Sequence, residues 1–278
     1  MKALSGQNNK HFYSKIGYFN KEFALFFYIE YNICVAKLYV IGTPIGNLGD
    51  ITYRAVETLK NVDYVAAEDT RHTLQLLNHL EIKKPLISCR AQNEKFASEN
   101  IIKLLEEGHD IAYASDAGTP GISDPGAVLV DCVREAGFEI VPIPGPAAFA
   151  TLVSVAGSGG KTLIFEGFLS PKPGRRRSRL RELMAQDAAI VLYESPYRVV
   201  KLLQDIADID SNRRIVVGRE LTKVHEEIND GPAGEILADY SSRSKVLGEF
   251  AIFISSNKNV KLLNEYSDNI KEEGYYDD

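Results

Sequence analysis

The chain has 278 residues, 45% hydrophobic and 25% charged, a length and composition typical of a globular protein with room for two buried cores. Its formal net charge of −6 argues against a protein that coats nucleic acid over its whole surface, although a local basic patch can still dominate one face. Its three cysteines and five histidines form no Cys-x-x-Cys pair and no His-Glu-x-x-His motif, which argues against a structural metal site and favours a reducing compartment.

The two ends of the chain differ from its centre. Residues 1–36 are rich in aromatic side chains without a clear period, and their apolar run at 23–29 is too short to span a bilayer. We predict a poorly ordered N-terminal extension there, or a gene start that is placed too early. At the other end, residues 257–278 are polar and acidic, which predicts a frayed tail.

A regular alternation of buried strands and amphipathic helices begins at Lys37 and predicts an α/β domain over residues 37–157. The predicted strands are short apolar runs at 38–41, 64–67, 86–88, 111–114 and 140–142. The predicted helices lie at 52–61, 71–80, 93–107, 127–134 and between 147 and 156. Strands that alternate with helices favour a parallel sheet, whose carboxyl ends lie along one edge.

The glycine-rich run at 157–160 predicts a domain boundary, and a second α/β domain is expected over residues 161–256. Its predicted strands lie at 163–165, 189–193, 215–217 and 246–255. Its predicted helices end at Met184 and Ile206.

The loop at residues 115–126 organises the first domain, because it joins a buried strand to a helix at the ligand-binding edge of the sheet. Two prolines stiffen it and three glycines leave its backbone bare, so that a ligand can approach closely. We expect Asp116 and the Gly-Thr-Pro sequence at 118–120 to bind a ligand. Asp124 is expected to cap the next helix, with Pro125 as its first residue. The alternative is a loop that is only a tight turn and a helix cap.

Three further strand ends of the first domain carry conspicuous residues, at 43–44, 68–71 and 144–146. In a parallel sheet all of them lie on one edge with Asp116, which favours a pocket there. Alone, Asp69 is equally well explained as a helix cap, and Arg71 as the partner of a neighbouring carboxylate.

A basic segment at residues 172–181 holds six positive charges and no negative one. On a chain with net negative charge, such a concentration is suited to contacts with phosphates. The alternative is a helix face that is only solvated.

Several motifs occur together and in order between Lys37 and Ser255. They are Thr-Pro-Ile-Gly-Asn-Leu at 43–48, Ala-Glu-Asp-Thr-Arg at 67–71, Ser-Asp-Ala-Gly-Thr-Pro at 115–120, Pro-Gly-Pro at 144–146, Phe-Glu-Gly-Phe-Leu at 165–169, Tyr-Glu-Ser-Pro at 193–196 and Arg-Glu-Leu-Thr-Lys at 219–223. As a set, they resemble the ribosomal RNA small subunit methyltransferase I family, ribose 2′-O-methyltransferases of the tetrapyrrole methylase fold.

This resemblance implies two α/β domains, with a mostly parallel sheet in the first and a mixed sheet in the second, and a methyl donor in the cleft between them. It implies an enzyme that transfers a methyl group from S-adenosylmethionine to the 2′-oxygen of a cytidine ribose in small-subunit (16S) ribosomal RNA. No metal is expected. The resemblance also implies a homodimer in the cytoplasm whose partner is the RNA or the small ribosomal subunit, and no membrane partner.

We assign candidate roles to individual residues on this basis. A ribose hydroxyl is a weak nucleophile, so a general base is expected, and the candidates are the group Glu68, Asp69 and Arg71, together with Glu94 and, as a weaker choice, Lys223. Glu194 and Ser195 are expected to close over the site from the second domain. The donor is expected to contact Pro44, Asp116, Gly118, Thr119, Pro120 and Ala147. The RNA phosphates are expected to contact Arg175, Arg176, Arg177, Arg179, Arg219 and Lys223.

The chain departs from the family pattern at three places. Gly121 replaces a larger apolar residue, which is expected to loosen a pocket wall, and Tyr197 stands where histidine is common. The run at 89–92 lacks the usual histidine before Asn93. Two other functions stay open, namely a methyltransferase of this fold that acts on a tetrapyrrole precursor or a protein residue, and a non-catalytic module that binds RNA or a nucleotide.

Overall fold

The computed structural model describes residues 36–157 and 159–256. The extension predicted for residues 1–36 lies outside this range except for its last residue, and the predicted acidic tail lies wholly outside it. The contacts divide the chain into two compact units, each built around a five-stranded sheet. No helix within the described ranges is both long enough and apolar enough to cross a membrane.

The sheet of the first unit is fully parallel, as predicted. Its strands follow the order β3-β2-β4-β1-β5. Their bounds are β1 (Lys37–Ile41), β2 (Tyr64–Ala67), β3 (Leu86–Ser88), β4 (Ile111–Ala114) and β5 (Glu139–Ile143). Pro142 is accommodated because β5 is an edge strand, where one side of the backbone needs no ladder partner. The central strand β4 is buried along its whole length.

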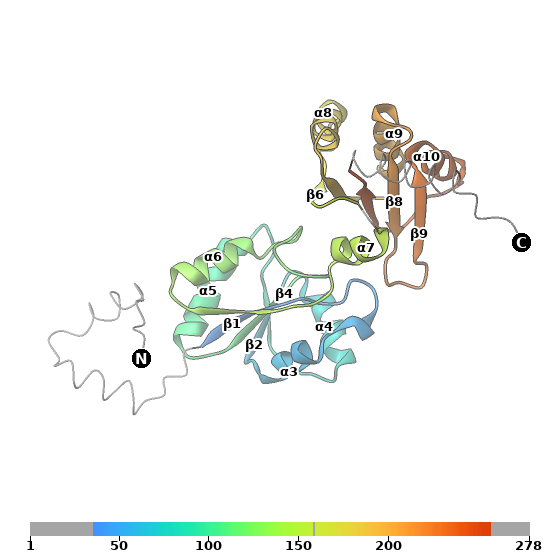
Figure 1. Cartoon of the computed structure of the whole chain (residues 1–278). Helices are drawn as coiled ribbons and strands as arrows, with labels where there is room; N and C mark the ends of the chain where they lie inside the picture. Colours follow the sequence, from blue (N-terminus) through green and yellow to red (C-terminus); the bar gives the residue numbers. More distant parts are fainter. Residues whose placement is uncertain (1–35, 158, 257–278) are drawn as a thin grey trace, which may run out of the picture. The chain divides into compact units, whose positions relative to one another are not determined.

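Helices cover both faces of this sheet (Figure 1). They are α3 (Tyr53–Asn61), α4 (Thr70–His79), α5 (Glu94–Glu106) and α6 (Ala127–Glu135), and a 3₁₀ turn η2 (Leu48–Asp50) follows β1. Ile101 of α5 and Leu129 of α6 pack with Leu38, Ile111 and Tyr113 of the sheet in one fully buried cluster. This apolar packing holds α5 beside α6, at the point where the loop from β4 ends.

Helix α6 starts at the residue predicted from the apolar pattern, 127, but the prediction that Asp124 caps it with Pro125 as its first residue is wrong. The helix begins at Ala127, and its capping position is Gly126 at φ 130°, without a side-chain hydrogen bond from that residue. Asp124 and Pro125 lie before the helix, so Asp124 does not cap it. The cap is supplied from another helix, as described below.

The sheet of the second unit is mixed, with strand order β6-β7-β10-β8-β9. Its strands are β6 (Leu163–Phe168), β7 (Ala189–Glu194), β8 (Arg214–Arg219), β9 (Glu227–Pro232) and β10 (Phe250–Ile254). Only the pair β6 and β7 is parallel. The sequence analysis missed the edge strand β9, and it began the last strand at residue 246, whereas β10 begins at Phe250.

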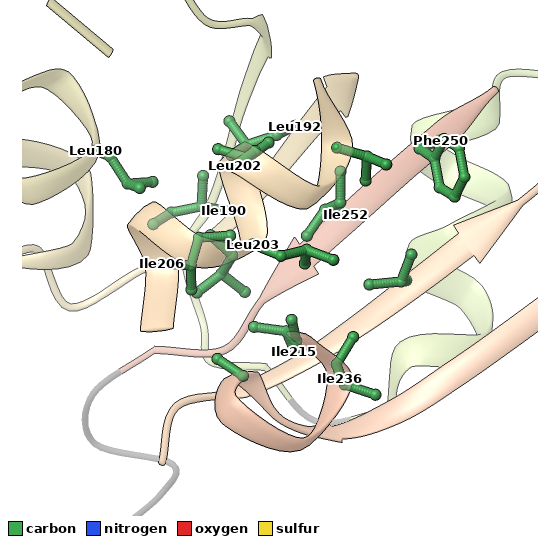
Figure 2. Close-up of a cluster of buried hydrophobic side chains, with 14 of the residues drawn as sticks. Leu180, Ile190, Leu192, Leu202, Leu203, Ile206, Ile215, Ile236, Phe250 and Ile252 are labelled. Carbon is green, nitrogen blue, oxygen red and sulfur yellow. The ribbon is translucent and has the colours of Figure 1, made fainter. Parts of the chain in front are cut away.

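Three helices cover one face of this sheet, and a fourth covers the other. The helices are α7 (Ala148–Ala156), α8 (Pro173–Met184), α9 (Val199–Ile209) and α10 (Ala233–Ser242), of which α10 was not predicted. Figure 2 shows Leu180, Leu202 and Ile236, one from each of α8, α9 and α10, packed with sheet residues that include Ile190 and Ile252. On the opposite face, Leu152 and Ala156 of α7 pack against β7, β8 and β10.

The division into units does not follow the sequence boundary at 157–160. Segments Gly42–Ile51 and Ala117–Thr119 group with the chain from Gly145 onward, whereas the strands that precede them belong to the first unit. Helix α7 likewise belongs to the second unit. The domain bounds 37–157 and 161–256 stay a prediction about folding units.

Candidate functional site

Side chains at the carboxyl ends of β2 and β4 link these two neighbouring strands in the first unit. The Asp69 backbone N–H donates to Asp116 Oδ1 over 2.9 Å. In return, the Asp116 N–H donates to Glu68 Oε2 over 3.4 Å. The structure therefore brings together Glu68, Asp69 and Asp116, as expected from a parallel sheet.

Glu68 is the carboxylate of this group whose pKa is raised. Partial burial is the largest cause, and the negative charges of Asp116, Asp124 and Asp69 add to it, while the hydrogen bond from the Asp116 N–H opposes the shift. A raised pKa makes a glutamate a stronger proton acceptor near neutral pH than an ordinary surface carboxylate. Glu68 thus has the electrostatic setting of a general base.

Asp69 has the opposite setting. Its Oδ1 caps α4 by accepting the Arg71 N–H over 2.9 Å, and the Arg71 guanidinium adds bonds of 3.1 Å to Oδ1 and 2.6 Å to Oδ2. These bonds hold the pKa of Asp69 well below its usual range. Asp69 is therefore a weak proton acceptor, and the cap and the ion pair considered as alternatives are both present. The Arg71 side chain is nevertheless 84% exposed, so it can meet an anion from solution.

Glu94, another candidate general base, lies apart from the hydrogen bonds that link Glu68, Asp69 and Asp116. Its side chain is buried, and Oε1 accepts the N–H groups of Gly126 and Leu129 over 2.9 and 3.0 Å. This oxygen is occupied by two backbone donors, so the geometry favours a structural role over the general-base role considered for it.

Three of the segments expected to hold the donor, at residues 43–44, 118–119 and 146–147, lie together in the second unit. Thr43 and Gly118 exchange backbone hydrogen bonds of 2.9 and 3.1 Å, and Thr119 Oγ1 donates to the carbonyl oxygen of Pro146 over 3.1 Å. Gly118 has φ 82°, a conformation that favours glycine, and a Cβ there would lie 3.2 Å from the Ile45 side chain. Pro44 and Ala147 adjoin these contacts along the chain, whereas Asp116 and Pro120 belong to the first unit.

A second close approach brings the two flanking glycines of this region together. A Cβ on Gly145 would lie 2.5 Å from the carbonyl oxygen of Gly42, and a Cβ on Gly42 would lie 2.7 Å from Gly145 Cα. Real side chains are not accommodated at such distances, so both positions require glycine. The result is a stretch of bare backbone beside Thr43 and Pro146.

The basic segment forms α8, and most of its predicted RNA-binding residues are engaged in ion pairs. Arg176 is buried and its Nε donates to Asp205 over 2.6 Å, while Arg177 donates to the other oxygen of Asp205 over 2.7 Å. Arg179 pairs with Glu166 and Glu182. Arg175 is exposed and forms no ion pair with any described residue. Arg176 is thus unavailable to a ligand, whereas Arg175 is free to meet one.

The other two residues predicted to contact RNA also have carboxylate partners. Arg219 lies 3.2 Å from Glu227, and Lys223 lies 2.9 Å from Glu220 and 3.0 Å from Glu249. The loop around Lys223 packs closely on the glycine-rich loop after β1, since a Cβ on Gly46 would lie 2.4 Å from Lys223 Cγ. Lys223 therefore has a packing role in the second unit, whatever else it contacts.

The structure also gives the environments of the remaining positions that the sequence analysis singled out. Glu194 is buried, and its Oε1 accepts the Ser195 N–H over 2.8 Å and Arg198 Nε over 2.7 Å, so the role expected for Glu194 and Ser195 stays a prediction. Gly121 has φ 78°, and a Cβ there would meet open space, so its backbone conformation explains the glycine. Tyr197 is 86% exposed.

Two exposed residues of the first unit, one of them in contact with Glu68, were given no role by the sequence analysis. Arg90 donates Nε to the carbonyl oxygen of Glu68 over 3.3 Å, and its own N–H is held by Asn93 Oδ1 over 2.7 Å. Phe96, in the first turn of α5, is 66% exposed. The only signal in the sequence was an arginine just after β3, in the run at 89–92, which was considered only for its missing histidine. Within the described part of the chain, no group of three or more His, Cys, Asp or Glu side chains is arranged to hold a metal ion.

Comparison with known proteins matches most of the chain. The family model of the Tetrapyrrole (Corrin/Porphyrin) Methylases matches residues 37–237. A protein of Borrelia garinii subsp. bavariensis named "Ribosomal RNA small subunit methyltransferase I" is 45% identical over 219 residues, which cover 78% of this chain and 98% of that protein. The protein of the same name from Thermotoga maritima is 45% identical over 225 residues, which cover 81% of this chain and all of that protein.

Solved structures share the fold at much lower identity. The methyltransferase CobJ superposes with a TM-score of 0.62 at 16% identity, covering 80% of this chain and 95% of that one. The cobalt precorrin-4 methyltransferase CbiF superposes with a TM-score of 0.60 at 17% identity, covering 79% of this chain and 94% of that one. The resemblance inferred from the motifs is confirmed, and the chain belongs to the tetrapyrrole (corrin/porphyrin) methylase family.

Proposed function

We propose that this protein transfers a methyl group from S-adenosylmethionine to the 2′-oxygen of a cytidine ribose in small-subunit ribosomal RNA. The names of the relatives at 45% identity support the RNA as acceptor. The observation that carries the proposal is the link between Glu68 and Asp116, which sets a proton acceptor at the sheet edge directly before the bare segment 117–119. The corrin methylases share the fold at only 16–17% identity, which does not favour a corrin acceptor.

The residues around the bare backbone fit a large, flat donor with a polar end. Gly118 and Gly145 leave backbone without side chains, and Asp116 supplies a carboxylate for an amine or hydroxyl. The residues that would hold the donor are Pro44, Asp116, Gly118, Thr119, Pro120 and Ala147. When bound, the donor supplies a methyl group on a positively charged sulfur, which is open to attack by an oxygen nucleophile. The residues of this chain contribute alignment, because displacement requires the nucleophile, the carbon and the leaving sulfur in line.

Glu68 is the general base we favour for the ribose hydroxyl. Its raised pKa suits proton abstraction, whereas Asp69 is held ionised by Arg71 and accepts a proton poorly. Arg71 then contributes its exposed guanidinium to a phosphate of the RNA, beside Arg90. Phe96 offers an exposed ring on which an unpaired base can stack.

Further contacts with RNA phosphates are proposed for the accessible basic residues of the second unit. Arg175 and Arg177 are exposed on α8, and Arg179, Arg219 and Lys223 are partly exposed. Arg176 is omitted because it is buried against Asp205. We also propose a homodimer that acts in the cytoplasm, where small ribosomal subunits are assembled in bacteria such as those of the relatives.

The test is methyl transfer from labelled S-adenosylmethionine to small ribosomal subunits from a strain that lacks this gene. Label on the 2′-oxygen of one cytidine is the expected result, and Glu68→Gln is expected to lower the rate by about 10²–10⁴-fold. Glu57→Gln, on the exposed face of α3, is the matched control and should leave the rate unchanged. Donor binding without transfer to subunits or to naked RNA would overturn the ribosomal acceptor, and label on a base would overturn the ribose.

A further inference from the structure

Helix α6 begins at the end of the loop that follows β4, and a carboxylate from a different helix caps it. Glu94, at the start of α5, accepts the N–H groups of Gly126 and Leu129, which are 32 and 35 residues away in the sequence. The capping position itself is Gly126, which has no side chain to do this. The four N–H groups at a helix start need partners, and a carboxylate there also meets the positive end of the helix dipole.

The burial of Glu94 indicates that its carboxylate is held in place by its hydrogen bonds. Only 7% of the residue is exposed, and a carboxylate is removed from water at a large cost unless hydrogen bonds replace the lost hydration. Two backbone donors at 2.9 and 3.0 Å supply this replacement at one oxygen. A merely solvated glutamate of a helix surface would have neither the burial nor the fixed partners.

The position of Gly126 ties this contact to the loop. A Cβ on Gly126 would lie 2.7 Å from the Tyr113 ring and 3.4 Å from Pro120 Cβ, so the loop exit lies directly against β4 and against Pro120. Within the loop, the Gly121 N–H donates to the Pro125 carbonyl oxygen over 3.3 Å. The segment from Pro120 to Gly126 is therefore a closed turn whose end is held by Glu94.

The beginning of the same loop is held by the other carboxylates. Asp116 is fixed by the Asp69 N–H and by Glu68, at the ends of β2 and β4. We infer that Glu94 is a positioning residue, which anchors the exit of the loop from Asp116 to Gly126 and so holds Asp116 and Pro120 in place for the methyl donor. This inference rests on the proposed function for its ligand, whereas the anchoring itself can be measured without a ligand.

Three substitutions at position 94 separate anchoring from general-base chemistry. Glu94→Gln keeps an oxygen at the same reach, which can accept both N–H groups. Glu94→Asp keeps the charge but withdraws it by one methylene, and Glu94→Ala removes the acceptor. An anchor therefore predicts that Gln is tolerated better than Asp, and a general base predicts the reverse order, because only Asp can take a proton from the acceptor.

The experiment measures the affinity for S-adenosylhomocysteine by titration calorimetry, the methyl-transfer rate, and hydrogen exchange at the Gly126 and Leu129 amides. We expect Glu94→Gln to stay within about threefold of the wild type in affinity, while Glu94→Asp and Glu94→Ala lose about tenfold or more, as for a buried hydrogen bond left unmade. Hydrogen exchange at the two amides should stay near the wild-type rate in Glu94→Gln and become faster in Glu94→Asp and Glu94→Ala. Glu99→Ala, on the exposed face of α5, is the control and should change none of the three.

Two results would overturn the inference. One is a loss of methyl transfer in Glu94→Gln at unchanged affinity and unchanged exchange, which identifies a base. The other is unaltered exchange and affinity in both Glu94→Asp and Glu94→Ala. Because Gln keeps the contact, the inference stays open to test even where Glu94→Ala fails to fold. If the wild-type protein does not bind the donor, the proposed function is wrong, and so is the claim that Glu94 positions residues for the donor. Protection of the Gly126 and Leu129 amides from exchange would still show that Glu94 anchors the loop.

Discussion

Arg176 and Asp205 form an ion pair in the interior of the second unit, with side chains that are 5% and 1% exposed and an Nε–Oδ2 distance of 2.6 Å. The second oxygen of Asp205 accepts Arg177 Nε over 2.7 Å, so one carboxylate of α9 holds two consecutive arginines of α8. A buried carboxylate needs both partners, since an unpaired charge in the interior is far more costly than a paired one. Two of the arginines of α8 that the sequence analysis assigned to RNA thus hold this helix against the core of the second unit.

Arg176→Ala should therefore act on stability. We expect the free energy of unfolding to fall by about 3–5 kcal/mol, because the substitution leaves Asp205 buried with one partner fewer. Urea unfolding followed by circular dichroism measures this fall. Arg175→Ala, on the same helix but exposed, is the control and should change the stability by less than about 0.5 kcal/mol while weakening RNA binding. Equal stability of the two variants would contradict a structural role for Arg176.

The rate of methyl transfer should depend on pH through Glu68. Its pKa is raised above the ordinary value of 4.5, so the ionised form that accepts a proton appears only at higher pH than for a surface glutamate. The rate should therefore rise with pH along a limb displaced upward from 4.5, and that limb should be absent in Glu68→Gln. Single-turnover rates between pH 4 and 9 give the profile. A limb that persists unchanged in Glu68→Gln would assign the titration to another group.

Arg71 should contribute to RNA binding through charge alone. Its guanidinium is 84% exposed, and a contact with one phosphate releases about one counterion. Arg71→Gln should weaken binding at low salt and reduce the slope of log K against log salt by about 0.7–0.9. Fluorescence anisotropy with a fragment of small-subunit RNA, repeated across salt concentrations, provides both numbers. His72→Gln, exposed at the next position of α4, is the control, and an equal effect there would argue against a specific contact.

Gly145→Ala should disturb the backbone cradle beside Thr43. The added methyl group would lie 2.5 Å from the Gly42 carbonyl oxygen, so one of the two segments must move. We expect the affinity for S-adenosylhomocysteine to fall by about tenfold or more, by analogy with strain of about 1–3 kcal/mol from overpacking. Gly174→Ala, where a Cβ meets open space, is the control. Unchanged affinity in Gly145→Ala would place the donor away from this backbone.

The first sheet could be predicted because its strands are short apolar runs with strong turn signals between them, and the parallel arrangement then placed Glu68, Asp69 and Asp116 on one edge. Strand β9 was missed for a physical reason. Its sequence, Glu-Ile-Asn-Asp-Gly-Pro at Glu227–Pro232, is polar because it forms an edge, and it has no apolar alternation by which to be recognised. Helix α10 starts directly after it with Ala233 and Gly234, which gave no cap signal.

Side-chain partners that are distant in sequence could not be predicted. Glu94 and Gly126 lie 32 residues apart, and Arg176 and Asp205 lie 29 apart, so each pairing depends on how two helices pack. Local rules instead offered Asp124 and Pro125 as a helix start and six positive charges as one surface. The helix start was wrong because Glu94 supplies the cap, and Arg176 is withdrawn from the surface by Asp205, whereas the RNA contact of the exposed arginines stays a prediction. The exposure of Arg90 and Phe96 likewise became visible only once α5 had been placed.

The assignment of Gly42–Ile51 and Ala117–Thr119 to the second unit has a consequence for genetic dissection of this protein. The polypeptide passes from one unit to the other at 41/42, 51/52, 116/117, 119/120 and 144/145, so no single cut separates them. A truncation after residue 157 would keep both loops but delete the Lys223 loop on which Gly46 packs. Two separately expressed halves should therefore fail to complement each other. An insertion into Gly42–Ile51 or Ala117–Thr119 should lower the stability of both units, because each of these segments is joined at both ends to strands or loops of the first unit.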